Sequence, residues 1–302
     1  MDRIGSLARR DLLYRQIRAF FHARDFVEVE TPLVVPSPGL ELHLDAFEVT
    51  GAGWLITSPE YQMKRLLAAG ARRIFQICKC FRRGEVGRHH NPEFTMIEWY
   101  RGGAGYEAIM DDCEALVASL ARALLGTTTV RAGGHVVDLA PPWERLTVRE
   151  AFARLGGGEP PPSDTSSDAF FQAFLDRVEP HLGHPKPTLL HEWPASLAAL
   201  ARRKPDHPEV AERFELFIGG LELANGFGEL TDPVEQRARF EADLAARRGL
   251  GKPLYPIDER FLADLSRMPP SGGVALGLDR LAMLLLGAPE IRDVLTFAAD
   301  EL

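Results

Sequence analysis

Residues 81–101 read FRRGEVGRHHNPEFTMIEWYR, a stretch dense in side chains that bind phosphate or ammonium groups. The apolar, partly β-branched run 74–81 leads into it, and its last part, FTMIEWY, also has the composition of a strand. We therefore predict two antiparallel strands joined by a polar loop. The two-residue period of a strand places four side chains of the second strand on one face: Phe94, Met96, Glu98 and Tyr100.

A carboxylate beside a phenol on that strand face would suit a small cationic ligand. The alternative is that Glu98 pairs with a neighbouring arginine on a solvated face, which is common for a single glutamate. The hairpin by itself leaves both interpretations open.

Length and composition are ordinary for a soluble globular protein: 302 residues, 45% hydrophobic and 26% charged. No apolar run approaches the ~20 residues of a membrane span, and the N-terminal sequence lacks the apolar core of a signal peptide. We therefore expect a cytoplasmic protein without membrane contact. A net charge of −8 without a basic tail argues against a wide tRNA-binding surface, although a local basic patch is compatible with it.

Neither the cysteines nor the paired histidines predict a metal site. Cys78, Cys80 and Cys113 lack a second Cys-x-Cys or Cys-x-x-Cys pair, so we expect buried thiols in a reducing cytoplasm. His181 and His184 form His-x-x-His without a carboxylate at the spacing of a zinc site, so we expect them in an exposed loop.

The chain begins with a predicted helix and strand. Residues 7–24 place apolar side chains at helical spacing, and FVEVETP, residues 26–32, alternates like a strand that ends at its proline. The stretch 33–53 is loop-like, with a short alternating strand expected around residues 42–49.

Two further helices and an inserted region follow. Residues 58–60, Ser-Pro-Glu, open a helix that ends at Gly70, and residues 106–125 form another amphipathic helix. From about residue 131 to 188 the composition changes, and GGGEPPPSDTSS at 156–167 is typical of an extended linker. We interpret 131–188 as helices and loops inserted into one domain.

A second cluster of carboxylates lies in residues 213–232, RFELFIGGLELANGFGELTD. The Gly-Gly pair at 219–220 between two alternating apolar runs predicts a two-residue hairpin turn. In that register Phe217 is opposite Glu222, and Glu215 lies on the same face at a diagonal distance of ~7–8 Å from Glu222. Two such carboxylates can share Mg²⁺, which takes its other ligands from phosphate and water. A solvated pair at a sheet edge is the alternative.

The third informative stretch, residues 271–287, reads SGGVALGLDRLAMLLLG. It predicts a glycine-rich strand that leads into a helix with Asp279 and Arg280 at its start. Asp279 is favourable near any helix N-terminus, whereas the glycines beside Arg280 allow a ligand to approach closely. Arg280 is therefore a candidate ligand contact.

The helix–strand–proline unit (7–32), the hairpin (81–101) and the strand–helix unit (271–287) resemble, in this order, motifs 1, 2 and 3 of class II aminoacyl-tRNA synthetases. Motif 2 is of the lysyl type, and nearly the whole chain resembles the elongation factor P ligases, truncated bacterial paralogues of lysyl-tRNA synthetase. This resemblance implies an α+β fold: one catalytic domain over 1–302 with a mainly antiparallel sheet flanked by helices. It also implies a homodimer through motif 1. Because motif 1 starts almost at the first residue, we expect no anticodon-binding OB-fold.

The resemblance assigns one set of residues to ATP and Mg²⁺. Arg82 would hold the α-phosphate and Arg280 the γ-phosphate, and these are the expected catalytic residues. Glu215 and Glu222 match the metal positions. The family reads Arg-x-Glu in motif 2, but Arg82 is followed here by Arg-Gly-Glu, so it stays open whether Glu85 or only backbone contacts adenine. Further ATP contacts are expected from Gly84, Glu85, His90, Asn91, Glu222, Leu223 and Gly277.

A second set of residues matches the lysine site of the family: Ser58, Glu60, Glu98, Tyr100, Asn225, Glu229 and Ala275. Glu60 would face the substrate amine and Glu229 the side-chain ammonium, for which a desolvated carboxylate makes a charge-assisted contact. Ala275 stands where lysyl-tRNA synthetases have glycine and agrees with the elongation factor P ligases. One methyl group in a pocket shifts selectivity by ~1–3 kcal/mol, enough to favour one lysine isomer.

The resemblance implies a reaction in two steps. The donor, (R)-β-lysine or less readily lysine, forms an acyl-adenylate with ATP, and a lysine ε-amine of elongation factor P then takes the acyl group and releases AMP. A minimal lysyl-tRNA synthetase is the first alternative, against which Ala275 and the missing OB-fold argue. A non-catalytic lysine- or nucleotide-binding paralogue is disfavoured because Arg82, Arg280 and the paired glutamates are present. Only a test of different acceptors distinguishes the ligase from an amide-forming synthetase with a small-molecule acceptor.

Overall fold

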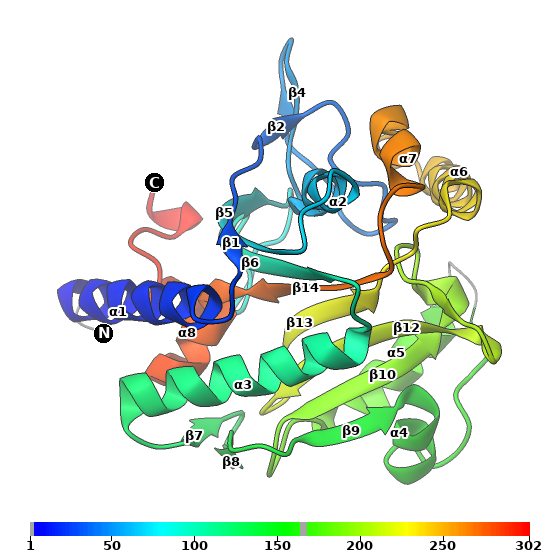
Figure 1. Cartoon of the computed structure of the whole chain (residues 1–302). Helices are drawn as coiled ribbons and strands as arrows, with labels where there is room; N and C mark the ends of the chain where they lie inside the picture. Colours follow the sequence, from blue (N-terminus) through cyan, green and yellow to red (C-terminus); the bar gives the residue numbers. More distant parts are fainter. Residues whose placement is uncertain (1–2, 164–167) are drawn as a thin grey trace.

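The computed structural model describes residues 3–163 and 168–302 (Figure 1). Its centre is a nine-stranded sheet in the order β1-β5-β6-β14-β13-β12-β10-β9, with β11 paired to β12. Neighbouring strands are antiparallel except in the pairs β1–β5 and β9–β10. The strands of this sheet are β1 (Val27–Glu28), β5 (Arg73–Phe81), β6 (Glu93–Gly102), β9 (Glu144–Thr147), β10 (Thr188–Pro194), β11 (Arg203–Lys204), β12 (His207–Ile218), β13 (Leu221–Gly228) and β14 (Ser271–Gly277).

Helices cover both faces of this sheet (Figure 1), as expected for the predicted α+β fold. Helices α1, α3 and α8 share the largest apolar core with one face. On the other face α2, α6 and α7 form a second core, and α4 and α5 form a third core with β10 and β12. The helices are α1 (Arg3–His22), α2 (Glu60–Ala68), α3 (Tyr106–Leu125), α4 (Val148–Arg154), α5 (Asp168–Arg177), α6 (Pro233–Gly249), α7 (Glu259–Leu265) and α8 (Leu278–Leu286).

Smaller elements complete the described chain. No helix in the two described ranges is long and apolar enough to cross a membrane. The small elements are the sheet of β2 (Val34–Val35), β4 (Gly53–Leu55) and β3 (Glu48–Val49), the hairpin of β7 (Thr129–Ala132) and β8 (His135–Asp138), and the 3-10 helices η1 (Glu179–His181), η2 (Ala195–Leu197), η3 (Ile291–Asp293) and η4 (Ala299–Glu301).

Most predicted elements form where expected. Helix α1 buries Leu13, Ile17 and Phe20, and α2 and α3 match the predicted second and third helices. Strands β5 and β6 pair along their length as the predicted hairpin, and β14 leads directly into α8. Cys80 and Cys113 are buried free thiols, as predicted, whereas the free thiol Cys78 is only half-buried.

The strand expected around residues 42–49 is wrong except for Glu48–Val49, and FVEVETP forms a strand only at Val27–Glu28. The guanidinium of Arg247 explains the first difference. Its Nη1 donates hydrogen bonds to the carbonyl oxygens of Glu41 (2.7 Å) and Leu44 (2.9 Å). Because a side chain satisfies these backbone acceptors, the segment has no need of a strand partner.

We predicted helices and loops for residues 131–188, but this region also supplies a strand to the central sheet. Strand β9 pairs in parallel with β10 and forms the edge of the nine-stranded sheet. Residues 156–163 of the predicted linker contain neither helix nor strand, and residues 164–167 lie outside the described residues. His181 is exposed as predicted, but the half-buried ring of His184 stacks on His135 with centroids 3.8 Å apart.

Candidate active site

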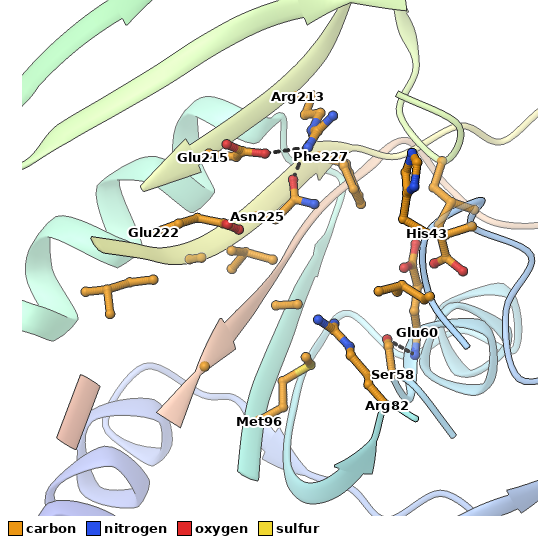
Figure 2. A pocket seen from close by; sticks show the side chains of 18 of the residues that line it. His43, Ser58, Glu60, Arg82, Met96, Arg213, Glu215, Glu222, Asn225 and Phe227 are labelled. Carbon is orange, nitrogen blue, oxygen red and sulfur yellow. Dashed lines mark hydrogen bonds and ion pairs between the residues drawn. The ribbon is translucent and has the colours of Figure 1, made fainter. Parts of the chain in front are cut away.

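A cavity of about 530 Å³ lies on the second face of the sheet, with a lining that includes residues of α2, α5 and α6. All predicted site residues line it except Gly84 and Glu98. Gly84 lies in the loop after β5 with a φ of 85°, and Glu98 is completely buried against two lining residues. Figure 2 shows two groups of side chains that face each other across this space: Glu215, Glu222 and Asn225 on one side, Ser58, Glu60 and Arg82 on the other.

One end of the cavity is built around the carboxyl group of Glu98. The Ser58 hydroxyl donates to Oε1 over 2.5 Å, and the Tyr100 hydroxyl donates to Oε2 over 2.9 Å. Burial, and next the charge of Glu60, raises the pKa of Glu98 to about 8. Glu98 is therefore largely protonated at neutral pH, and a cation bound nearby would favour its ionised form.

Glu60 and Glu229 lie at the same end and share one ammonium group. Lys64 follows Glu60 by one turn of α2, and its Nζ contacts Glu60 Oε1 and lies 2.5 Å from Glu229 Oε2. Burial would lower the pKa of Lys64, but the charges of Glu229 and Glu60 raise it above its usual value. Burial raises the pKa of Glu229 to about 8 against the opposing charge of Lys64, and the charge of Glu60 adds to the rise. Because of the short contact, we treat Lys64 and Glu229 as an ion pair.

The opposite wall depends on Arg213, which bridges two predicted site residues (Figure 2). Its Nη2 pairs with Glu215 Oε1, and its Nε donates to Asn225 Oδ1 over 3.2 Å. The guanidinium carbon lies over the Trp193 ring, 4.5 Å from its centroid, in a cation–π contact. One arginine thus orients the acceptor oxygens of both Glu215 and Asn225.

A β-bulge sets which side chains of β13 face the cavity. Phe217 pairs with Glu222 as predicted, but Leu216 pairs with Ala224, so Leu223 is the extra residue. Without the bulge, the two-residue period would place Glu222 and Asn225 on opposite faces. With it, both line the cavity, and Glu215 pairs with Asn225 rather than lying diagonal to Glu222 in a regular ladder.

Two arginine side chains of the predicted ATP site also line the cavity, Arg82 and Arg280. The side chain of Arg82 lies over the Phe94 ring at 5.0 Å, and its Nη1 is 3.8 Å from Glu85 Oε2. Within the described residues, Arg82 Nε is buried without a hydrogen-bond partner. This guanidinium therefore keeps donors available for an anion in the cavity.

Arg280 is held more tightly at the start of α8. Its Nη1 donates to the Glu222 carbonyl oxygen over 2.8 Å, its Nη2 donates to His90 Nε2 over 2.6 Å, and its Nε lies 3.3 Å from the His89 carbonyl oxygen. Burial, and next the charge of Arg280, lowers the pKa of His90. A neutral His90 is the form that can accept this bond.

Asn91 lines the cavity but uses its amide elsewhere. Its Nδ2 donates to the Glu93 carbonyl oxygen over 2.5 Å, and its Oδ1 accepts from the Ala299 backbone N–H over 3.0 Å. The side chain thus ties the loop after β5 to the C-terminal segment. Any contact of Asn91 with a ligand would replace or add to these bonds.

The chemistry of Glu215 and Glu222 fits a magnesium ion. Burial raises the pKa of Glu215 to about 8. Arg213 opposes this shift, and the neighbouring charge of Glu222 adds to it. Over residues 3–163 and 168–302 no group of three or more His, Cys, Asp or Glu could hold a metal ion. Two carboxylates with room for phosphate and water ligands are what Mg²⁺ accepts.

The mainly antiparallel sheet flanked by helices agrees with the predicted synthetase fold, and comparison of the sequence identifies the family. The family model for tRNA synthetases class II (D, K and N) matches residues 5–301. The chain belongs to this family. Class II membership implies the use of ATP.

Individual relatives are similar over nearly the whole chain. The Elongation factor P--(R)-beta-lysine ligase of Erwinia tasmaniensis is 41% identical, with 98% of this chain and 96% of the relative covered. The protein of the same name from Salmonella gallinarum has the same identity and coverage. That of Proteus mirabilis is 42% identical, with 97% of this chain and 95% of the relative covered.

Two residues that the sequence analysis did not single out contact several site residues. Lys64 is fully buried beside Glu60 and Glu229, and Arg213 joins Glu215 to Asn225. The spacing Glu-x-x-x-Lys in α2 was a visible signal for Lys64, since residues four apart meet on a helix face. No comparable local signal marks the contact of Arg213 with Asn225, because it crosses between strands.

Proposed function

We propose that this protein activates a lysine-type amino acid with ATP and ligates it to a lysine side chain of elongation factor P, with (R)-β-lysine as the preferred donor. The relatives are named for this donor and acceptor, and they cover nearly the whole chain. One observation in the cavity carries the proposal. Carboxylates and arginines line one cavity, as a diammonium donor and a nucleotide require.

The acidic end supports a donor with two ammonium groups. Glu60, Glu98 and Glu229 would bind these groups by charge-assisted hydrogen bonds. Side chains that hydrogen-bond or lie beside this end would orient the donor: Ser58, Tyr100, Asn225 and Ala275. Their placement in one cavity supports this assignment.

In the first step, the donor carboxylate attacks the α-phosphorus of ATP. A bond between a carboxylate oxygen and phosphorus forms, and the bond to pyrophosphate breaks. Arg82 would hold the α-phosphate and Arg280 the γ-phosphate, and their charge would stabilise the transition state without a covalent enzyme intermediate. Predicted ATP contacts are completed by Gly84, Glu85, His90, Asn91, Leu223 and Gly277.

Glu215 and Glu222 would hold Mg²⁺ together with the phosphates. When bound, this ion would neutralise negative charge on the nucleotide. The Arg213 guanidinium pairs with Glu215 in this structure. Binding of Mg²⁺ by Glu215 would therefore require Arg213 to give up this pair.

In the second step, the deprotonated ε-amine of a lysine on elongation factor P attacks the acyl carbonyl. The new amide bond forms, the amine proton leaves, and AMP departs. Such an acceptor would place the reaction in the cytoplasm. Exposed apolar residues on α1 and around β1 and β2 support the homodimer expected through motif 1: Leu7, Leu12, Val27, Leu33 and Val34. A tRNA acceptor is the second candidate, supported by the family model alone.

Donor binding should strengthen as the pH rises from 6 to 8. The raised pKa of Glu98, about 8, means that a proton must leave before the carboxylate can bind an ammonium group. Below this pKa the donor KM should rise about tenfold for each pH unit lost. Pyrophosphate-exchange kinetics between pH 6 and 9 would measure it, with the ATP KM as internal control. A flat donor KM in the wild type, or an unchanged slope in Glu98→Gln, would contradict the assignment.

Replacing Ala275 with glycine should change donor preference. Ala275 pairs with Asn225 on one side and with Glu98 on the other, so its methyl group lies in the middle of the proposed donor site. Loss of that methyl should raise kcat/KM for lysine relative to (R)-β-lysine by about tenfold, within the ~1–3 kcal/mol of one methyl group. Competition between the two donors would measure this ratio, and Ala288→Gly, at the end of α8, is the matched control.

The proposed function is tested by donor-dependent exchange of pyrophosphate into ATP and by release of AMP. We expect exchange with (R)-β-lysine, weaker exchange with lysine, and AMP release that rises when elongation factor P is added. Exchange without a response to elongation factor P would keep the activation step and reject the acceptor. Failure to exchange with either donor would reject the proposal.

A further inference from the structure

Lys64 has no part in the reaction described above, yet its ammonium lies among the carboxylates of the donor site. Its side chain is 0% exposed, and its Nζ contacts Glu60 Oε1 and lies 2.5 Å from Glu229 Oε2. The ring centroid of Phe227 lies 6.0 Å from the same nitrogen. Burying an ammonium is costly unless the surrounding charges compensate for it. The structure therefore provides a cation that stays in the site whether or not a donor is bound.

The sum of the charges around Lys64 indicates which class of ligand fits this part of the cavity. Glu60, Glu98 and Glu229 carry three negative charges when ionised, and Lys64 carries one positive charge. The remaining charge of −2 matches the two ammonium groups of a diamino acid. A donor with one ammonium group would leave one carboxylate without a cation, which would then have to bind a proton.

Two further carboxyl groups line the cavity, those of Glu41 and Asp243. Burial, opposed by Arg239 and Arg247, raises the pKa of Asp243 to about 6. Burial, and next the charge of Glu60, raises the pKa of Glu41 to about 7, while Arg82 acts against this shift. Two phenols are neutral at physiological pH, because burial raises the pKa of each: Tyr61 and Tyr100.

We infer that Lys64 is a resident counter-ion of the donor site, which pairs with Glu60 and Glu229, keeps both carboxylates in place and thereby sets the number of bound ammonium groups at two. This inference rests on the proposed function, because it takes the ligand to be a diamino acid. Lys64 is thus a positioning residue: it acts on the donor through the two glutamates. Without it, three neighbouring carboxylates would repel one another and take up protons instead of binding ammonium groups.

The test is Lys64→Met, which preserves length and removes the charge. Calorimetric titration with lysine between pH 6 and 9 should show a dissociation constant at least tenfold higher than in the wild type, with ATP affinity changed less than about threefold. The pH below which lysine binding is lost should move up by about one unit or more, because removing a positive charge raises the pKa of the neighbouring carboxylates. Lys79→Met, on a half-buried lysine whose side chain is 43% exposed and pairs with Glu93 at 3.1 Å, is the matched control.

A second variant separates charge from folding. Lys64→Met combined with Glu60→Gln restores the charge of −2, so this double variant should fold. The pH below which it loses lysine binding should return to the wild-type value, although its affinity for lysine stays low. If Lys64→Met folds with unchanged affinity and pH dependence, the inference is wrong. It is also wrong if the double variant fails to fold or keeps the shifted pH dependence.

The wild-type enzyme distinguishes this inference from the proposed function. Binding of lysine without pyrophosphate exchange would reject the proposed reaction, and the Lys64 comparison would still decide the role of the counter-ion. If the wild type binds neither lysine nor (R)-β-lysine, both are rejected. Binding of 6-aminohexanoate, which has one ammonium group, as tightly as lysine would contradict the count of two.

Discussion

Replacing Arg82 with alanine should lower the rate of donor-dependent pyrophosphate exchange by about 10²–10³-fold, the usual cost of removing one donor that stabilises transition-state charge. Within the described residues, Arg82 Nε is buried without a hydrogen-bond partner, so the guanidinium has donors free for a phosphate. The loss should fall mainly on kcat, because the charge on the α-phosphate develops as the bond to pyrophosphate breaks. Steady-state exchange at saturating ATP and donor would measure it.

The matched control for Arg82 is Arg88→Ala in the same loop. The Arg88 side chain is 70% exposed and its Nε lies 3.8 Å from Glu290, so its removal should leave exchange within about twofold of the wild type. Equal losses in both variants would mean that the loop tolerates no change, and would remove the evidence for a phosphate contact by Arg82. Normal exchange by Arg82→Ala would show directly that another group holds the α-phosphate.

Replacing Glu229 with glutamine should raise the donor KM by about 10²-fold or more. Glu229 Oε2 pairs with Lys64, and within the described residues Oε1 has no hydrogen-bond partner, so that oxygen is free for a donor ammonium. Truncating one partner of a buried charge pair costs about 2–5 kcal/mol. Pyrophosphate exchange as a function of donor concentration would measure the change, while the ATP KM should stay within about threefold.

Glu209→Gln is the matched control for this substitution. The Glu209 side chain is 69% exposed on β12 and pairs with His207 at 3.4 Å, so its loss should not change donor KM. If Glu229→Gln binds donor normally while it folds normally, the acidic end of the cavity is not the ammonium site. A drop in thermal stability with an unchanged donor KM would assign Glu229 to folding alone.

Local patterns predicted the elements that position the site. The alternation around motif 2 identified β5 and β6, the Gly-Gly pair identified the β12–β13 turn, and the glycine-rich run before Arg280 identified β14 and α8. In each case the signal lies within one or two adjacent elements. The resemblance to synthetases then named residues that the structure brings into one cavity, with Gly84 and Glu98 just outside its lining.

Features that depend on distant parts of the chain were not predicted. The bulge at Leu223 turns Asn225 toward Glu215, yet nothing in the alternating sequence of β13 marks it. The segment 41–44 avoids a strand because Arg247, some 200 residues later, binds its carbonyl groups. Likewise Arg213 joins two strands through side chains that a one-dimensional pattern does not relate.

The most direct test of the account is the intact mass of elongation factor P after incubation with this enzyme, Mg-ATP and (R)-β-lysine. Parallel reactions would contain lysine as donor, or tRNA as acceptor. We expect the factor to gain the mass of one β-lysyl group, in higher yield than with lysine, and tRNA to stay uncharged. An unmodified factor together with lysyl-tRNA in the parallel reaction would contradict it.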